Sequence, residues 1–475
     1  MGTESLRRSN ICRKRKRRNQ LTAGPTSVHD LTDDLLELVL LRLDSPIGLV
    51  RSAATCKRWH RLMAGTYGAA FLRRFRSLHP PQAIGTFYSI NLDGSRSYGQ
   101  DHVWPEMDPM FVPSSASASD EPSGALQLSI DFVPPANRGT RELVDGRGSL
   151  LLLLGEKDRT ERPTCMCCWI AADYMTPDLV VCEPLTRQYQ AIPPPSGRSV
   201  CVLGAFLLDG DTSTGAAIGM KNFRVLLVHY EPDYSNGEVN GHGHPLASVF
   251  TRGGRNGRWH CGEKDEVGVY LPRLDEVQLA GRTGGRIYWG CEDKQVVVLD
   301  ERTLQFSAMT LAEQMMKWLE FGRDNFRVVG GGHSGMVRIV HLTYDGEVEV
   351  FGHGRGNDDW VLEMRVRMEE ASRGLVVEHE EEDCFAGETR IIDADESLVV
   401  LLPPNETCLF SVDLETMMLK REDGRKKKYN GTAFPYTLPW PPVMRACLDD
   451  GTKRRKRRRK RRRKRPSSDR NEQSS

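Results

Sequence analysis

The segment LTDDLLELVLLRLDSPIGLVRSAATCKRWHRLMAGTYGAAFLRRFRSLHP, residues 31–80, decides the fold of the N-terminal part of this chain. Thr32 is suited to cap a helix whose first turn carries Asp33 and Asp34, where carboxylates favour the positive helix end. A unit of about 50 residues has too little interior to bury every leucine of this segment. The surplus is expected to meet the rest of the chain or another protein. The apolar positions that share one face of this helix are Leu35, Leu38, Val39 and Leu43.

Two further helices are expected in the same segment. Pro46 is placed to begin the second helix after the break at Asp44 and Ser45, because proline suits the first helical turn. A later helix is predicted over Tyr67–Leu78, and it ends at His79 and the two prolines that follow. The prediction is a small three-helix domain over 29–78. A leucine-rich hairpin packed inside a larger domain is the alternative.

Four short pieces of this segment together resemble an F-box. They are Leu31-Thr32-Asp33-Asp34-Leu35-Leu36, Val39-Leu40, Arg42-Leu43-Asp44 and Cys56-Lys57-Arg58-Trp59. Thr32 departs from the proline usual in that family, which bears on affinity more than on docking. The resemblance implies docking onto a Skp-type adaptor and, through it, onto a cullin–RING ubiquitin ligase. The residues expected to bind the adaptor are Leu31, Leu35, Leu38, Val39, Leu43, Leu49, Val50 and Trp59.

Residues 85–446 show short apolar runs separated by Gly, Pro, Asp and Asn, which is typical of an all-β domain. The prediction is an α+β multidomain chain whose larger domain is a β-propeller, with a large sandwich or irregular β-domain as the alternative. One helix is expected within it, over Leu311–Phe321. Strands are predicted at Leu150–Leu154, Leu179–Cys182, Val200–Leu208, Arg224–Tyr230, Arg286–Trp289, Val296–Asp300, Val337–Leu342, Glu347–Phe351, Val361–Val366, Leu398–Leu402 and Leu409–Val412.

A weak repeat supports the propeller. Glu183, Asp300 and Asp413 each follow an apolar run, with Thr three residues later and an apolar residue three places further on. The pattern predicts a hairpin in which the carboxylate and the Thr hydroxyl bond turn amides and the last residue returns to the core. The separations of 117 and 113 residues suit two or three blades of ~45 residues each.

This half also resembles plant F-box proteins that carry a C-terminal propeller-like associated domain. The matching pieces are Asp178–Arg187, which reads DLVVCEPLTR, and Ile192–Pro195. Taken with the F-box, the resemblance covers about 29–446. It implies that the β-domain binds a protein substrate.

The tails carry most of the positive charge. The formal net charge is +2, yet without the basic runs 13–18 and 453–465 the chain has 47 cations against 64 anions, a balance of −17. Residues 1–28 and 447–475 are expected to be disordered. Nuclear import is predicted for the protein, with presence in the cytoplasm as well, and a weak, salt-dependent nucleic-acid contact is the competing role of the basic runs. The residues expected to direct import are Arg13, Lys14, Arg15, Lys16, Lys453, Arg454, Arg455 and Lys456.

No catalytic, cofactor or metal site is predicted. Gly330–Gly335 matches a dinucleotide-binding glycine pattern, but a strand rather than a helix follows it, so a turn between strands is expected. Cys165–Cys168 lacks a second pair of ligands, and the twelve cysteines suit reduced thiols. His242, His244, His260 and Cys261 are predicted to lie in a mobile loop.

The sequence therefore predicts a non-catalytic substrate receptor of a Skp–cullin–F-box ubiquitin ligase. The alternative is a nuclear nucleic-acid-associated protein that acts through its polybasic tail. The longest apolar run, Leu150–Leu154, is too short to cross a membrane, and no secretory signal is expected.

Overall fold

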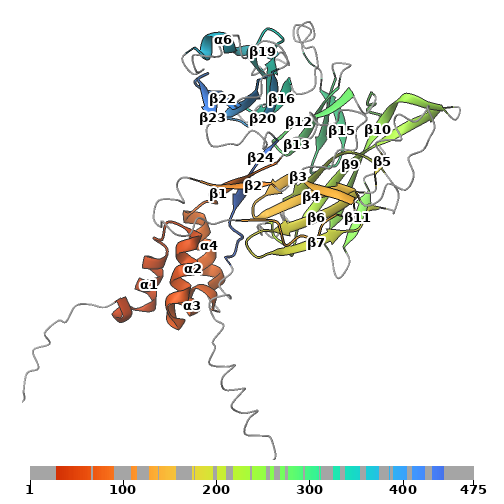
Figure 1. Ribbon diagram of the computed structural model, residues 1–475. Helices are drawn as coiled ribbons and strands as arrows, with labels where there is room; N and C mark the ends of the chain where they lie inside the picture. The colour runs from red at the N-terminus through yellow and green to blue at the C-terminus, as the bar shows by residue number, and fades with distance from the viewer. Residues whose placement is uncertain are drawn as a thin grey trace, which may run out of the picture. The chain divides into compact units, whose positions relative to one another are not determined.

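The computed structural model describes two compact units, one comprising the described residues up to Pro80 together with Pro441 and Pro442, and the other running from Pro81 to Trp440. Figure 1 shows both units. The residues described are 28–65, 68–89, 109–114, 128–136, 138–156, 174–175, 177–195, 200–209, 218–235, 238–252, 257–261, 268–272, 276–291, 295–309, 311, 325–331, 337–353, 360–373, 385, 389–403, 409–422 and 431–442.

The first unit is helical. Its elements are η1 (Val28–Asp30), α1 (Asp33–Leu40), α2 (Pro46–Thr55), α3 (Lys57–Ala64) and α4 (Gly68–Leu78). The Thr32 hydroxyl accepts a hydrogen bond from the Leu35 N–H at 3.4 Å, and Ser45 caps α2 by accepting from the Gly48 N–H at 3.3 Å. The described unit thus has four α-helices where three were expected, because Cys56–His60 belongs to a helix of its own.

The four helices enclose a small apolar core. Arg58 of α3 pairs with Asp33 at 2.7 Å, and Arg74 of α4 pairs with Glu37 at 2.5 Å, so the start and the middle of α1 are tied to later helices. The His79 ring bonds the Leu41 carbonyl at 2.8 Å. The side chains of this core, each 5% exposed or less, are Leu36, Leu40, Leu41, Leu49, Ala53, Met63, Phe71 and Phe75.

The second unit is a six-bladed β-propeller. The described residues form six antiparallel sheets, whose strands follow in chain order except in the closing blade. The first two are β3 (Arg138–Arg147), β4 (Leu150–Glu156), β6 (Pro177–Glu183), β7 (Gln188–Ile192), and β5 (Tyr174–Met175), β8 (Val200–Leu208), β9 (Arg224–Ser235), β10 (Glu238–Thr251), β11 (Arg258–Cys261). The next two are β12 (Val277–Thr283), β13 (Arg286–Cys291), β14 (Val296–Asp300), β15 (Phe306–Met309), and β16 (Phe326–Gly330), β17 (Val337–Leu342), β18 (Glu347–His353), β19 (Trp360–Arg367). The fifth is β20 (Arg390–Ala394), β21 (Leu398–Leu402), β22 (Leu409–Asp413), β23 (Leu419–Glu422), and a short helix, α6 (Met368–Ala371), follows β19.

Continuous apolar runs form the middle strands because each blade is covered on both faces. In β9, Leu226 and Val228 pack with β13 and β14, whereas Val225 and Leu227 pack with β4 and β6. Such strands lose the alternation of a half-exposed sheet. All eleven predicted strands are present, and this agreement reflects the strength of the apolar runs.

The sixth blade joins the two ends of the propeller. It consists of β2 (Met110–Pro113), β1 (Ala83–Tyr88) and β24 (Ala433–Thr437), in that order. Ala83 pairs with Thr437 in the antiparallel register, and the Thr437 N–H donates to the Gly148 carbonyl of the next blade at 2.8 Å. The ring is therefore closed by backbone pairing between strands that lie about 350 residues apart.

Four of the inner strands carry a bulge, whereas β16 keeps a regular register. The register shifts at Leu143/Asp145 in β3, Val202/Gly204 in β8, Leu279/Gly281 in β12 and Ile391/Asp393 in β20. A bulge bends a strand and increases its twist, as the tight inner wall of a ring requires. At Gly281 a Cβ would lie 2.0 Å from the Val328 carbonyl oxygen of β16, so only glycine fits there.

The predicted repeat is a recurrent turn between the third and fourth strands of alternate blades. Asp300 and Asp413 accept hydrogen bonds from the backbone N–H three residues later at 2.9 and 2.8 Å. Burial is slight there, and the backbone bonds hold the pKa of both carboxyls below its usual value. Each acidic position precedes, by four residues, a non-glycine residue with φ of +53° to +60°. The three such residues are Arg187, Leu304 and Met417.

Two expectations about this repeat need correction. Each separation covers two blades, which is one of the two numbers expected, but each blade is longer than the ~45 residues expected. The return to the core also fails in the first copy, where Tyr189 is 45% exposed, although Leu419 is buried.

Other predicted features differ from the structure or lie outside it. His242 and His244 are in β10, and His260 and Cys261 are in β11, so the predicted loop is wrong: the Gly- and Asn-rich stretch forms a long hairpin. Gly330 and Gly331 do lead from one antiparallel strand toward the next. Cys165–Cys168, both tails and Leu311–Phe321, except for buried Leu311, lie outside the described residues. None of the described helices has the length and apolarity needed to span a bilayer.

Candidate functional site

The apolar residues of α1 divide between the core and solvent. Leu36 and Leu40 are buried, whereas Leu35, Leu38 and Val39 are 50%, 53% and 47% exposed. Positions three and four apart lie on one helix face, so the exposed residues form a stripe. Neighbouring exposed apolar side chains on so small a unit are typical of an interaction surface. This stripe, Leu35, Leu38 and Val39, is called the α1 stripe below.

Local contacts fix the outward direction of the α1 stripe. Leu36 and Leu40 insert into the core, and the ion pairs of Asp33 and Glu37 hold the helix against α3 and α4. Arg58 also donates to the Leu31 carbonyl just before the helix. The stripe is therefore a preformed surface whose presentation needs no rearrangement of α1.

The remaining residues predicted to bind the adaptor lie deeper. Leu31, Leu43, Val50 and Trp59 are half-buried, and Leu49 is completely buried in the helical core. The Trp59 indole N–H is buried without a hydrogen-bond partner among the described residues. Leu49 thus supports the surface from below, and three of the eight predicted residues make up its exposed part. The predicted import residues, Arg13, Lys14, Arg15, Lys16, Lys453, Arg454, Arg455 and Lys456, lie outside the described residues.

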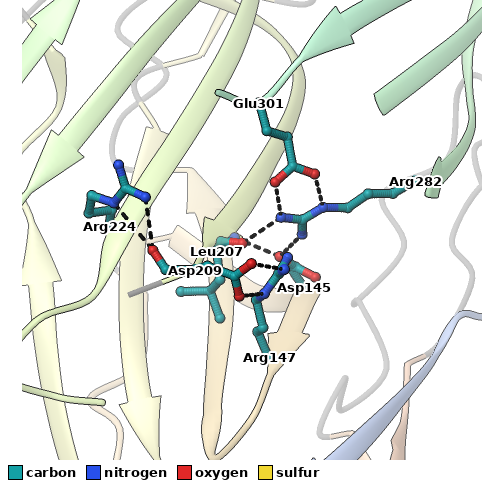
Figure 2. A network of polar contacts seen from close by, with 7 residues as sticks. All are labelled: Asp145, Arg147, Leu207, Asp209, Arg224, Arg282 and Glu301. Atoms are coloured by element: carbon teal, nitrogen blue, oxygen red, sulfur yellow. Dashed lines mark hydrogen bonds and ion pairs between the residues drawn. The ribbon is translucent and has the colours of Figure 1, made fainter. Parts of the chain in front are cut away.

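The propeller contains a network of polar side chains centred on Arg282 of β12 (Figure 2). Its guanidinium donates to Glu301 at 2.7 and 3.0 Å, to Asp145 of β3 at 2.9 Å and to the Leu207 carbonyl of β8 at 2.6 Å. Asp145 also accepts from the Leu207 N–H at 2.6 Å. These contacts connect three successive blades, and we call the group of Arg282, Asp145 and Glu301 the blade clamp.

The blade clamp is a structural site. The Arg282, Asp145 and Glu301 side chains are only 18%, 11% and 12% exposed. Burial raises the pKa of Asp145, while the charge of Arg282 and the Leu207 N–H oppose that rise. Four of the five N–H donors of the guanidinium bond to protein acceptors, so the clamp serves mainly to join blades. The clamp is not predictable from the sequence, because Arg282 and Asp145 are 137 residues apart and no local pattern links them.

The fourth sheet contains a buried histidine in a row of polar residues that crosses three neighbouring strands. His341, Glu349 and Arg365 are direct neighbours on β17, β18 and β19. The His341 ring approaches Glu349 at 3.4 Å, and burial lowers the pKa of His341. With His341 and Glu349 2% and 5% exposed, the pair has no open side from which a substrate could approach. The described residues hold no cluster of three or more potential metal ligands.

A shallow groove of about 600 Å³ follows the outer strand β15. Tyr270, Gln295, Gln305 and Phe306 line it, and Tyr270 is 56% exposed. The lining carries amide and aromatic groups and no ionisable acid–base pair. Its chemistry suits contact with a polypeptide better than bond breaking.

Comparison with solved structures gives only distant likenesses. The Cps50 (Swd1) β-propeller domain from Myceliophteria thermophila is 10% identical, with a TM-score of 0.31 and coverage of 61% of this chain and 75% of that one. AofleA from Arthrobotrys oligospora is 10% identical, with a TM-score of 0.32 and coverage of 57% and 66%. A protein of unknown function from Bacteroides thetaiotaomicron is 9% identical, with a TM-score of 0.31 and coverage of 59% and 58%. No conclusion follows from likeness this weak.

Comparison with protein families is decisive for the larger unit. No curated protein matches the chain. The model of the F-box protein AT5G49610-like β-propeller matches residues 170–444, more than half of the chain. That match agrees with the six sheets observed and with the repeat of turns at Glu183, Asp300 and Asp413. The chain therefore belongs to the AT5G49610-like F-box protein β-propeller family.

Proposed function

We propose that this protein is a substrate-receptor subunit of a Skp–cullin–F-box ubiquitin ligase. In this proposal the helical unit is the F-box and binds a Skp-type adaptor, and through it a cullin–RING ligase. The propeller binds a target protein. The observation that carries the proposal is the α1 stripe, a preformed apolar surface on the helical unit of a chain whose propeller belongs to an F-box protein family.

The proposed mechanism is proximity rather than bond chemistry by this chain. Holding a target near a ubiquitin-loaded partner turns a bimolecular encounter into an effectively intramolecular one. Only four residues, 79–82, connect α4 to β1, so the tether between the two binding units is short. Short tethers keep the effective concentration of tethered groups high. The chain is accordingly proposed to be non-catalytic, with no cofactor.

Burial of the α1 stripe supplies a usable part of the affinity for the adaptor. Each of its three side chains is about half exposed. Burying the exposed halves contributes on the order of 1 kcal/mol per residue. The double variant Leu35→Asp/Leu38→Asp loses the burial free energy of two leucines and places two charges in an apolar interface. We therefore expect at least ~100-fold weaker adaptor binding.

The test is binding of the purified full chain to a recombinant Skp-type adaptor by calorimetry. Leu78→Asp is the matched control, because Leu78 is a 60% exposed leucine of the same helical unit that lies outside the stripe. The proposal holds if the double variant loses binding while the control keeps it. It fails if the wild-type chain does not bind the adaptor, or if both variants bind equally well.

Nuclear localisation belongs to the same proposal. The basic residues Arg13–Lys16 and Lys453–Lys456 are proposed to direct import, since short dense Lys/Arg runs suit that recognition. A fluorescent fusion that lacks both runs should lose its nuclear accumulation, whereas a fusion that keeps either run should retain part of it.

A nucleic-acid role of the polybasic tail is the competing function. Its thirteen consecutive cations without aromatic residues suit phosphate contact, and such binding would fall steeply with salt. Deletion of 453–465 distinguishes the two functions. Adaptor binding should survive the deletion if the ligase proposal is right, and retention on nucleic acid at low salt should vanish if the tail is a nucleic-acid clamp.

A further inference from the structure

Arg42 lies two residues beyond the end of α1, next to the α1 stripe. The backbone stays helical there: Leu41 has φ −68° and ψ −16°, and the Arg42 N–H donates to the Val39 carbonyl at 3.1 Å. Arg42 is seven residues after Leu35, four after Leu38 and three after Val39. These spacings place it on the same helix face as the three apolar residues.

The charge of Arg42 is uncompensated within the described residues. Its side chain is exposed, and no acidic group of the described chain pairs with it. Two other arginines of the unit do form ion pairs, since Arg58 and Arg74 pair with Asp33 and Glu37 on α1. Those two carboxylates are therefore already engaged by α3 and α4.

The helical unit as a whole also carries an excess of positive charge. Residues 28–80 contain eight Lys and Arg against five Asp and Glu, an excess of three positive charges. A partner that covered the α1 stripe with an apolar surface alone would remove the Arg42 guanidinium from water without a counter-charge. Leaving a buried charge unpaired is costly. A carboxylate on the partner, placed beside its apolar pocket, avoids that cost and fixes the register of α1.

We propose that Arg42 is a specificity-determining residue of adaptor docking, and that the partner surface presents an acidic side chain to it. The inference rests on the proposed adaptor binding and adds a charge requirement to it. The partner surface thus has two parts: an apolar pocket for Leu35, Leu38 and Val39, and a carboxylate at the end where α1 finishes. A partner lacking that carboxylate is discriminated against even if its pocket fits.

A purely intramolecular role is the competing account of Arg42. A cation near a helix C-terminus interacts favourably with the helix dipole, and such an effect would act on folding rather than on binding. The two roles give different readouts. The dipole role changes the melting temperature of the helical unit, and the docking role changes adaptor affinity and its dependence on salt.

The experiment measures adaptor affinity for the full chain by calorimetry at 50 mM and 500 mM salt, with circular dichroism as a check on folding. The variants are Arg42→Gln, which removes the charge, Arg42→Glu, which reverses it, and Arg42→Lys, which keeps it. Arg73→Glu is the matched control, because Arg73 is an exposed arginine of α4 that also lacks an ion pair among the described residues.

We expect Arg42→Gln to bind about fivefold more weakly at low salt and Arg42→Glu about 30-fold more weakly, with near-wild-type binding by Arg42→Lys and Arg73→Glu. The losses should shrink at high salt, because screening weakens charge pairs at an interface edge. Unchanged affinity of folded Arg42→Glu, or an equal loss in Arg73→Glu, overturns the inference while adaptor binding itself stands. Failure of the wild-type chain to bind the adaptor overturns the proposed function as well.

Discussion

Replacing Arg282 with methionine should destabilise the propeller more than any surface substitution. The change removes four hydrogen bonds, two of which cross to other blades, and it leaves Asp145 and Glu301 without their cation. Both carboxylates are only 11–12% exposed, so water replaces the lost partner poorly. Removing one member of a buried ion pair typically costs ~3–5 kcal/mol, a large part of the stability of an ordinary domain.

The assay is urea unfolding of the full chain, followed by tryptophan fluorescence. Trp289 lies in the core between the second and third blades and packs against Phe206, over whose ring Arg282 lies, so it should report the loss. Arg286→Met is the control, because Arg286 is 57% exposed and its 3.9 Å pair with Asp300 should be worth less than ~0.5 kcal/mol. A loss below ~1 kcal/mol for Arg282→Met would refute the view that the clamp holds the blades together.

The pH dependence of the same variant gives an independent check. Without Arg282, burial acts unopposed by the main counter-charge and raises the pKa of Asp145 further. A carboxyl whose pKa is higher in the folded state than in the unfolded state binds its proton more tightly when folded, so its unfavourable contribution grows as the pH rises. The deficit of Arg282→Met relative to wild type should therefore be smaller at pH 5 than at pH 7.

Three further predictions concern the propeller alone. Truncation before Ala433 removes β24 and should abolish the cooperative unfolding transition in calorimetry, whereas truncation after Trp440 should leave the melting temperature unchanged. Gly281→Ala should cost ~1–3 kcal/mol in urea unfolding, because its Cβ meets a backbone carbonyl at 2.0 Å, whereas Gly219→Ala, with its nearest neighbour at 3.8 Å, should cost far less. Asp300→Asn should flatten the fall in melting temperature below about pH 4, since a carboxyl with a lowered folded-state pKa stabilises the fold above its unfolded pKa and loses that contribution as the pH falls.

The sequence was informative where structure is determined locally. Val200–Leu208, Val296–Asp300 and Val337–Leu342 are strands with the predicted limits, because apolar runs between turn residues mark strands buried on both faces. The predicted cap at Thr32 is also local, and it forms. Of the candidate site, the outward direction of Leu35, Leu38 and Val39 agrees with the helical spacing from which docking was predicted.

The remainder depends on contacts between distant residues. No window of sequence places Arg282 beside Asp145, since the contact exists only after three blades have stacked. The β9–β10 hairpin was missed for a different reason. His242 and His244 lie among glycines that favour turns, but pairing across β9 overrides this local preference. The number of blades was also hidden, because only alternate blades keep the acidic turn.

The pairing of β1 with β24 has a consequence for how the protein is made. The first strands of the propeller leave the ribosome more than 300 residues before the strand that completes their sheet. Until Ala433–Thr437 has been synthesised, the inner edge of β1 stays unpaired, and an unpaired strand edge readily pairs with other chains. Chaperones, or rapid synthesis of the remaining strands, would therefore be needed to prevent the β1 edge from pairing with other chains before β24 is made.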